Sequence, residues 1–508
     1  MPSLARNTAW LTLAKTISVS IYALFGLVLP RLVSAAENGV YTLMSTLLFF
    51  GGLAASFGVP VILIRNIARD RSLAGQIYVD ARRAMIAGAV LSAVFVLVYL
   101  LAEMALQGSF DPARLLLSLF VVALLFVDAL ASLSESMFQA HERMVFPARV
   151  EVLTGLVRGG GALLSLLFLP GAGLFGVFAC FLAGSSVRAL ILVRAARRRY
   201  LTAADLPEPD WRRTLALVRE SFGVALFRVM RMVRNRADSL LLGIVIVPAA
   251  GLGLMEAADS ARGLYGQAMR VIFVFHTFTM ALNTAIFPRM ARLTADPNGQ
   301  GEARRQFGRV VRYQAWWSCL LAVLVFQYSD ELAGWFGPAY LNGIEGIVGT
   351  TGQALRILVV AVLIDSVAGP VGMVMVGRPE MDRMLPIFGG SLATVSIVLN
   401  LALIPRYGVL GAAYASLGAS IVEFGLKVYF MKILLGSARS LLGVLPHLAL
   451  AGAIALGLHG SPLAARPLLG GAAALAVYLL VGLALGLVDP ALTRRLSSAL
   501  GRGGRPRS

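Results

Sequence analysis

The sequence has few charged residues, few histidines and almost no cysteine. Asp, Glu, Lys and Arg make up 14% of the 508 residues, against 58% for hydrophobic residues. That balance is typical of membrane proteins rather than of soluble ones. The two cysteines, Cys180 and Cys319, lie far apart within apolar runs and carry no disulfide or metal signature. The four histidines are scattered without metal-ligand spacing, so the sequence predicts no metal site.

Motifs of enzyme active sites are also missing. The sequence has no phosphate-loop glycine pattern, no nucleophile elbow and no HExxH motif. We therefore expect no catalytic residues and no resident cofactor, and the chain is predicted not to be an enzyme.

Apolar runs long enough to cross a bilayer recur from one end of the sequence to the other. The spans are expected at 9–31, 41–64, 84–106, 115–138, 150–169, 172–193, 221–247, 257–288, 313–329, 353–376, 385–404, 409–431, 441–459 and 466–488. Short connections join them and leave no room for a separate soluble domain. The sequence thus predicts an all-α integral membrane protein with about fourteen transmembrane helices.

The distribution of the basic residues behind the net charge of +19 indicates the membrane topology. If both termini are cytoplasmic, the connections on that side hold most of the arginines. The opposite side then holds little beyond Arg31, Arg114, Arg406 and Arg466. This is the positive-inside distribution. We therefore expect a multi-pass protein with both termini in the cytoplasm and no nucleic-acid partner.

Four arginines interrupt the seventh span, where a membrane helix should be most apolar. They are Arg228, Arg231, Arg234 and Arg236, and Asp238 follows them. Each arginine would cost roughly 2.5–3.5 kcal/mol if it faced lipid. The first three share one arc of the helix with Asn235 and Asp238. Arg236 lies off this arc and is expected to pair locally or to face a neighbouring helix. The one-sided stripe predicts a water-filled cavity that receives an anion.

Two interpretations of this stripe are open. In the first, Arg228, Arg231 and Arg234 line the cavity and bind an anionic cargo through charge-assisted hydrogen bonds. In the second, the helix begins later and the arginines extend to the cytoplasmic interface. Pro248 limits how far the span can slide, which favours the first interpretation. Lys15 in the first span is expected to add to a positive cavity lining.

The eighth span carries a second polar face on one arc of about 120°. Its members are Glu256, Asp259, Arg262, Gly266 and Arg270. Arg270 lies at a depth comparable with the arginine stripe and is a further candidate for cargo binding. Glu256, Asp259 and the preceding Asp238 are candidates for coupling to a proton or a sodium ion. The alternative is a structural role, for example an ion pair between Asp259 and Arg262 at i,i+3.

The chain also contains an internal duplication. Residues 164–188 align without gaps with residues 399–423, and Gly173 falls on Gly408. The offset equals six spans, so both copies enter the membrane in the same orientation. Such a repeat predicts two six-helix lobes related by an axis along the membrane normal. Chance similarity between Pro-containing turns is the alternative, and a fixed register over about 25 residues speaks against it.

The repeat predicts how the chain is organised. An N-lobe of helices 1–6 is expected at 1–194, followed by a cytoplasmic linker at 195–220. A C-lobe of helices 7–12 is expected at 221–433. Helices 13 and 14 with a basic cytoplasmic tail complete the chain at 434–508. The cavity is expected between the two lobes.

A parallel six-plus-six arrangement with two additional helices resembles the multidrug/oligosaccharidyl-lipid/polysaccharide exporter superfamily. The motifs that carry the resemblance are Gly39-Val-Tyr41, Ile64-Arg65, Met137-Phe-Gln-Ala-His-Glu-Arg-Met144 and Asp238-Ser-Leu-Leu-Leu-Gly243. Within the superfamily, the chain looks most like bacterial polysaccharide-biosynthesis flippases. Where relatives commonly have Gly-x-Tyr before helix 8, this chain has Gly251-Leu-Gly-Leu254. It has no close match to the arginine motifs in the first helices of peptidoglycan-precursor flippases, which makes lipid II a less favoured cargo.

The resemblance implies a transporter of the bacterial cytoplasmic membrane. Its cargo would be undecaprenyl-pyrophosphate-linked oligosaccharide, moved by alternating access, with proton or sodium coupling in place of a cofactor. Membrane lipid is an expected partner, and a polysaccharide polymerase and glycosyltransferases are candidate partners. The alternatives are a lipid II flippase and a cation-coupled multidrug exporter of the same fold, which would favour an acidic or aromatic cavity. A membrane transferase would need a carboxylate or metal cluster, and a scaffold would not explain the intramembrane arginines.

Overall fold

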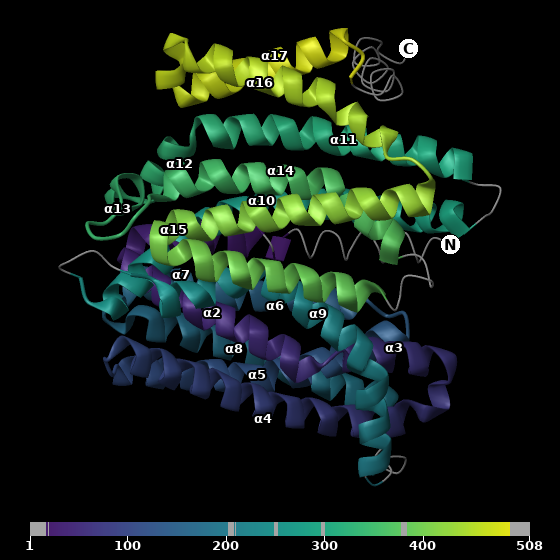
Figure 1. Cartoon of the computed structure of the whole chain (residues 1–508). Helices are drawn as coiled ribbons and strands as arrows, with labels where there is room; N and C mark the ends of the chain where they lie inside the picture. Colours follow the sequence, from purple (N-terminus) through teal and green to yellow (C-terminus); the bar gives the residue numbers. More distant parts are fainter. Residues whose placement is uncertain are drawn as a thin grey trace, which may run out of the picture. The chain divides into compact units, whose positions relative to one another are not determined.

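The structure is a computed structural model, and it describes residues 17–18, 20–201, 208, 210–247, 252–295, 300–376 and 384–487. These residues form helices and short connections, without a strand among them (Figure 1). The helices up to α10 are Ser20–Leu32, α2 (Ala35–Ser56), α3 (Val59–Arg69), α4 (Ala74–Gln107), α5 (Pro112–Ala140), α6 (Val145–Gly155), α7 (Gly161–Phe168), α8 (Gly173–Tyr200), α9 (Trp211–Val245) and α10 (Leu254–Ala295). A π-helical turn, Leu156–Gly160, joins α6 to α7.

The rest of the chain is helical in the same way. Its helices are α11 (Gln300–Gln327), α12 (Ser329–Phe336), α13 (Pro338–Asn342), α14 (Thr351–Val376), α15 (Met384–Leu435), α16 (Leu445–His459) and α17 (Pro467–Ala484). The long helix α15 contains one non-helical residue, Gly408, where two helices meet at a kink. It therefore covers the two predicted spans 385–404 and 409–431.

Ten helices among the described residues are long and apolar enough to cross a membrane. This confirms an all-α, multi-span membrane protein but not the count of fourteen. The kinked α15 is one helix in that set although the sequence predicts two spans there. The helix Ser20–Leu32 is shorter than a full span. Helix α9 carries many charges and is therefore not among these ten apolar helices. The number of membrane crossings stays a prediction.

The helices divide into two compact units. Unit 1 comprises the described residues up to Gln267 together with Ile344–Ile347 and Ile404–Gly408, and unit 2 comprises the remainder. Helix α9 and the first third of α10 therefore pack with the N-terminal helices. The boundary at Gln267 differs from the predicted boundary between the lobes at 195–220. The assignment of lobes stays a prediction.

Local sequence explains where the helices of unit 1 begin. At α2, the Ser34 hydroxyl accepts from the Glu37 amide (3.1 Å), and the Glu37 carboxylate accepts from the Ser34 amide (2.8 Å). This capping box satisfies donors that the first turn leaves unpaired. At α5, Asp111 accepts from the backbone of Ala113 (2.9 Å), and Pro112 occupies the first helical position.

The two aligned glycines of the duplication share one unusual backbone conformation. Gly173 has φ 47° and ψ −134°, and Gly408 has φ 52° and ψ −124°. Only glycine adopts this region readily, because it has no Cβ. Two positions matched by sequence alone thus turn the chain in the same way, which agrees with the predicted repeat.

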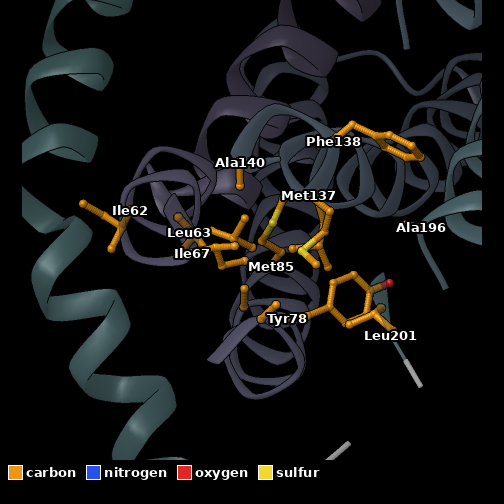
Figure 2. Close-up of a cluster of buried hydrophobic side chains, with 14 of the residues drawn as sticks. Ile62, Leu63, Ile67, Tyr78, Met85, Met137, Phe138, Ala140, Ala196 and Leu201 are labelled. Atoms are coloured by element: carbon orange, nitrogen blue, oxygen red, sulfur yellow. The ribbon is translucent and has the colours of Figure 1, made fainter. Parts of the chain in front are cut away.

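A hydrophobic cluster closes one end of unit 1, where α3, α5 and α8 end and α4 and α9 begin. Figure 2 shows Leu63, Met85 and Met137 from three of these helices gathered together. The ring of Phe138 lies 5.2 Å from that of Tyr200, and His141 stacks on Tyr200 at 4.1 Å. This cluster fixes the end of the bundle from which α9 starts.

Candidate functional site

The arginine stripe lies on α9, which begins at Trp211 rather than at residue 221, the predicted start of the span. The side chain of Asp210 caps the helix by accepting from the Arg212 amide at 2.9 Å. Along one side, α9 packs against α2, α3 and α4, and Ser221, Ala225 and Met232 are buried there. The arginines therefore lie well inside a continuous helix, and both interpretations of the stripe stay predictions.

Two of the arginines are exposed. Arg228, Arg231 and Asn235 are exposed in the structure, and we refer to these three residues as the arginine face. Ser221 lies two turns before Arg228 on nearly the same side of the helix but is 0% exposed. This side of α9 is therefore covered at Ser221 and exposed at Arg228. Within the part of the chain that the structure describes, neither Arg228 nor Arg231 has an ion pair or hydrogen bond. The arginine face therefore offers two guanidinium groups with free donors.

The other two arginines are less available. Arg234 is partly buried and donates from Nη1 to Asn235 Oδ1 at 3.0 Å. The guanidinium of Arg236 lies over the ring of Phe49 on α2, 5.7 Å from its centroid. The expectation that Arg236 faces a neighbouring helix is thus confirmed.

Asp238 does not belong to the exposed face, although it was expected on the same arc. It is 4% exposed, and Tyr265 of α10 donates its hydroxyl proton to Asp238 Oδ2. Its other oxygen, Oδ1, accepts from the Ser239 amide at 2.7 Å. The arc continues along α9, but α10 covers it at this level, so the stripe is shorter than the sequence predicts.

Four buried charged residues on α4, α5 and α10 form a network. They are Glu103, Arg114, Asp259 and Arg262, and we refer to them as the buried ion network. Arg262 pairs through Nη2 with Glu103 Oε1, and Arg114 pairs through Nη2 with Asp259 Oδ2. Arg262 Nη1 also lies 3.5 Å from Asp259 Oδ1. The side chains of all four residues are at most 6% exposed. The second polar face on α10 is therefore largely buried within unit 1.

Neutral groups also contact this network. Arg262 Nε donates to the Ser239 carbonyl at 2.9 Å, and Arg262 Nη2 donates to the Tyr99 hydroxyl at 3.2 Å. Gln107 Nε2 donates to the Gly243 carbonyl at 2.9 Å. Arg262 thus has several protein partners that hold its charge in place. The network ties α10 to α4, α5 and α9.

Glycines let the helices approach closely around the network. A Cβ on Gly243 would overlap the Arg262 guanidinium and the Glu103 carboxylate, and one on Gly39 would overlap the Asp259 carbonyl. Gly39 and Gly243 both lie in the motifs that carry the family resemblance. Their role in this structure is to admit the charged side chains and the backbone of α10.

The remaining sequence-predicted residues are Glu256, Arg270 and Lys15. Glu256 is exposed near the start of α10. Arg270 is partly buried and belongs to unit 2, beyond the boundary at Gln267. Lys15 lies outside the described residues. The observed pair of Asp259 with Arg262 corresponds to the structural alternative, and the structure leaves the proposed roles of these residues as predictions.

A second group of charges lies within the spans of unit 1. Arg158, on the π-helical turn, donates to both carboxylate oxygens of Asp128 at 2.6 and 2.9 Å. Arg188 pairs with Glu135 and lies 3.4 Å from Glu151. Single π-helical turns often place a functional or strained side chain. Here the turn directs Arg158 to a carboxylate on another helix, so each of these charges is paired.

Sequence reasoning missed Glu103 and Arg114 as network members. Glu103 could have been found as an acidic residue inside the predicted span 84–106, since such residues usually have a partner. Arg114 was one of four arginines on the side that the positive-inside rule leaves poor in basic residues, and that exception was its only signal. Its partner on α10 is 145 positions away in the chain.

The exposed guanidinium groups of α9 are suited to binding an anion. Among the described residues, no group of three or more His, Cys, Asp or Glu side chains could hold a metal ion. The two arginines of the arginine face lie on one side of α9, and the buried carboxylates Asp238 and Asp259 are paired with tyrosine and arginine. Attraction of a negatively charged group is therefore what the geometry of α9 provides.

The family is decided by a comparison with known protein families. Residues 4–294 match the family described as polysaccharide biosynthesis protein. The chain belongs to this family. The match includes the arginine face and the whole buried ion network. A search of curated proteins found no match.

Solved structures show the same fold. The lipid II flippase MurJ in an inward closed conformation is 14% identical, with a TM-score of 0.69 over 94% of this chain and 98% of that one. An inward-facing multidrug resistance MATE transporter is 14% identical, with a TM-score of 0.58 over 83% and 96% of the two chains. A transporter from Pyrococcus furiosus, described as having a binding pocket of reverse polarity, gives 0.51 at 14% identity over 84% and 96%. The chain thus has the fold of MurJ and of MATE transporters of the MOP superfamily.

Proposed function

We propose that this protein is a flippase that moves undecaprenyl-pyrophosphate-linked oligosaccharide across the bacterial cytoplasmic membrane. The observation that carries the proposal is the exposed arginine face of α9 in a membrane protein of the polysaccharide-biosynthesis family. Pyrophosphate is a multivalent anion that cannot enter the hydrocarbon without partners to replace water. Arg228 and Arg231 supply such partners at one level of one helix.

The mechanism follows from the chemistry of the two guanidinium groups. Residues three apart on a helix are neighbours, with Cβ atoms about 5–6 Å apart, so Arg228 and Arg231 can act on one head group. Their planar forks donate paired hydrogen bonds to phosphate oxygens. The glycan and pyrophosphate would occupy a cavity while the polyprenyl chain stays in lipid, and alternating access would release the cargo on the far side. Arg234, Arg270 and Lys15 are further candidates for cargo binding.

Ion coupling is part of the proposal, and its candidates are Asp238, Glu256 and Asp259. We favour Asp238 because its partner on α10 is the neutral hydroxyl of Tyr265. Asp259 contacts two arginines. Its protonation would remove the negative charge from both ion pairs, which makes proton uptake costly. Glu256 is exposed and has the least protein environment around it.

A lipid II flippase is the second candidate, because the fold matches MurJ over nearly the whole of both chains. Both cargoes would present a polyprenyl-linked pyrophosphate, so the arginine face suits either one. They differ in the glycan, and the consequence of losing the protein separates them. A multidrug exporter of cationic compounds is less favoured, because an arginine face repels cations.

Deletion of the gene tests the proposal. Cells should accumulate lipid-linked repeat units on the cytoplasmic face and lose surface polysaccharide, while peptidoglycan synthesis continues. Accumulation of peptidoglycan precursor followed by lysis would favour lipid II as the cargo. Unchanged surface polysaccharide together with new drug sensitivity would contradict both flippase candidates.

A further inference from the structure

The first three turns of α9 expose large apolar side chains. Trp211, Leu215 and Phe222 are 59%, 57% and 55% exposed. Helix α9 has 35 residues and is about 52 Å long, while about 20 residues suffice to cross the hydrocarbon. The first turns of α9 therefore lie at or beyond the edge of the hydrocarbon. Exposed apolar residues in that region contact lipid head groups and upper acyl chains.

These side chains form a stripe with arginines along one border. At about 100° per residue, Trp211, Leu215 and Phe222 lie within an arc of about 40°. The exposed Arg219 and Arg212 follow on the same side of this arc, about 60–80° from its centre. The other side of α9 packs against α2, α3 and α4. We refer to these five residues as the Trp211 stripe.

The first turn of α9 is held in place by α4. The guanidinium of Arg83 lies 3.7 Å from the centre of the Trp211 ring, which is a cation–π contact. Arg213 Nε lies 3.1 Å from Asp80 Oδ2, and Arg213 Nη2 donates to the Glu208 carbonyl at 2.7 Å. The stripe is thus a fixed surface and not the loose end of a helix.

The positive charge around the Trp211 stripe favours an anionic ligand. The same end of unit 1 exposes further arginines, among them Arg69, Arg71, Arg143, Arg197, Arg198 and Arg199. The chain has only three lysines, Lys15, Lys427 and Lys432, among its 45 basic residues. Arginine forms paired hydrogen bonds with phosphate where lysine acts as a point charge. An apolar stripe bordered by arginine matches a molecule that has a phosphate beside an acyl chain.

We propose that the Trp211 stripe binds an anionic phospholipid of the surrounding leaflet. Arg212 and Arg219 hold its phosphate, and the apolar side chains of Trp211, Leu215 and Phe222 lie against the same lipid. The combination of basic and aromatic residues at a membrane surface favours anionic over zwitterionic lipid. This site is separate from the arginine face, and the inference goes beyond the proposed transport of lipid-linked glycan.

Native mass spectrometry of the full-length protein in detergent tests this site with two probes, phosphatidylglycerol and phosphatidylcholine. The wild type should bind one phosphatidylglycerol about tenfold more tightly than phosphatidylcholine, since each arginine near the surface contributes to the attraction. R212Q/R219Q should lose that preference. L215Q should weaken both lipids, because it removes apolar contact without changing charge.

R197Q/R198Q is the matched control, because it removes the same charge from the same end of unit 1 without touching the stripe. It should change phosphatidylglycerol affinity by no more than about twofold, because salt screens separated surface charges. Equal binding of the two lipids by the wild type would overturn the proposal. An equal loss in R197Q/R198Q and R212Q/R219Q would also overturn it, because attraction would then be diffuse. If R212Q/R219Q fails to fold, R219Q alone replaces it with the same expected direction.

Discussion

Arg262 and Glu103 form an ion pair in which both side chains are buried, with 0% and 1% of their surface exposed. The pair joins α10 to α4, and Asp259 and Tyr99 lie within hydrogen-bonding reach of the same guanidinium. Desolvation of two charges costs several kcal/mol and is offset only when further partners are present. The additional hydrogen bonds of Arg262 meet that condition, so the pair fixes how α10 packs more than it adds net stability.

The first prediction is that R262A strongly destabilises unit 1. Removal of the guanidinium leaves Glu103 buried without its partner, at a cost of about 3–5 kcal/mol. The loss should appear as a lower unfolding midpoint of the purified protein in detergent. The double variant E103L/R262M should lose less than R262A, since apolar groups can replace a buried pair at little cost. A double variant as unstable as R262A would contradict this explanation.

The second prediction concerns two glycines on α9. G243A should destabilise the protein, because the added methyl group would overlap Arg262 and Glu103. G223A lies on the same helix with nothing within 4 Å of its Cβ and should be neutral or stabilising, by up to about 1 kcal/mol. Unfolding midpoints measured side by side check the difference. If the two substitutions had the same effect, close packing at Gly243 would be refuted.

The third prediction tests the internal duplication through its backbone. G173A and G408A should each cost about 1–3 kcal/mol, because alanine is strained at the φ of 47° and 52° that these residues adopt. G171A is the control, since its Cβ would meet nothing within 4 Å and its φ is not in this region. Thermal unfolding should show similar losses for the two aligned positions. Tolerance at either one would argue against an equivalent turn.

The broad fold could be predicted because it depends on properties that the sequence shows directly. Apolar run length predicted the spans, and the register of the repeat predicted that Gly173 and Gly408 are equivalent. Helix boundaries were less certain. The start of α9 at Trp211 was missed because its first turns are polar on one side and continue as a helix beyond the apolar run. A hydropathy pattern cannot report such an extension.

The ion network could not be predicted because its partners are distant in sequence. Arg262 and Glu103 are separated by 159 positions, and only the packing of α10 on α4 brings them together. Helical periodicity placed Asp238 beside the arginines of α9, as the arc requires. It could not show that Tyr265 covers that residue, because periodicity specifies a side of a helix but not the neighbour on it.

The fourth prediction separates ion coupling from structure at Asp238. D238N keeps the shape of the side chain and can still accept a hydrogen bond from Tyr265, so the unfolding midpoint should change little. Transport by this variant should no longer respond to a proton gradient. Y265F is the companion variant, because it removes the hydroxyl and leaves the carboxylate in place. A gradient response equal to that of the wild type in D238N would remove Asp238 as the coupling residue.

Anion binding by the arginine face is central to the proposed transport, and translocation by the purified protein tests it most directly. Proteoliposomes containing lipid-linked oligosaccharide should show glycan appearing on the far leaflet, where an impermeant enzyme can digest it. R228Q/R231Q should slow this by at least about tenfold, since each charge-assisted hydrogen bond contributes about 1.5–3 kcal/mol. R143Q, which removes an exposed arginine between α5 and α6, should translocate at the wild-type rate. A wild-type rate in R228Q/R231Q would contradict the central claim.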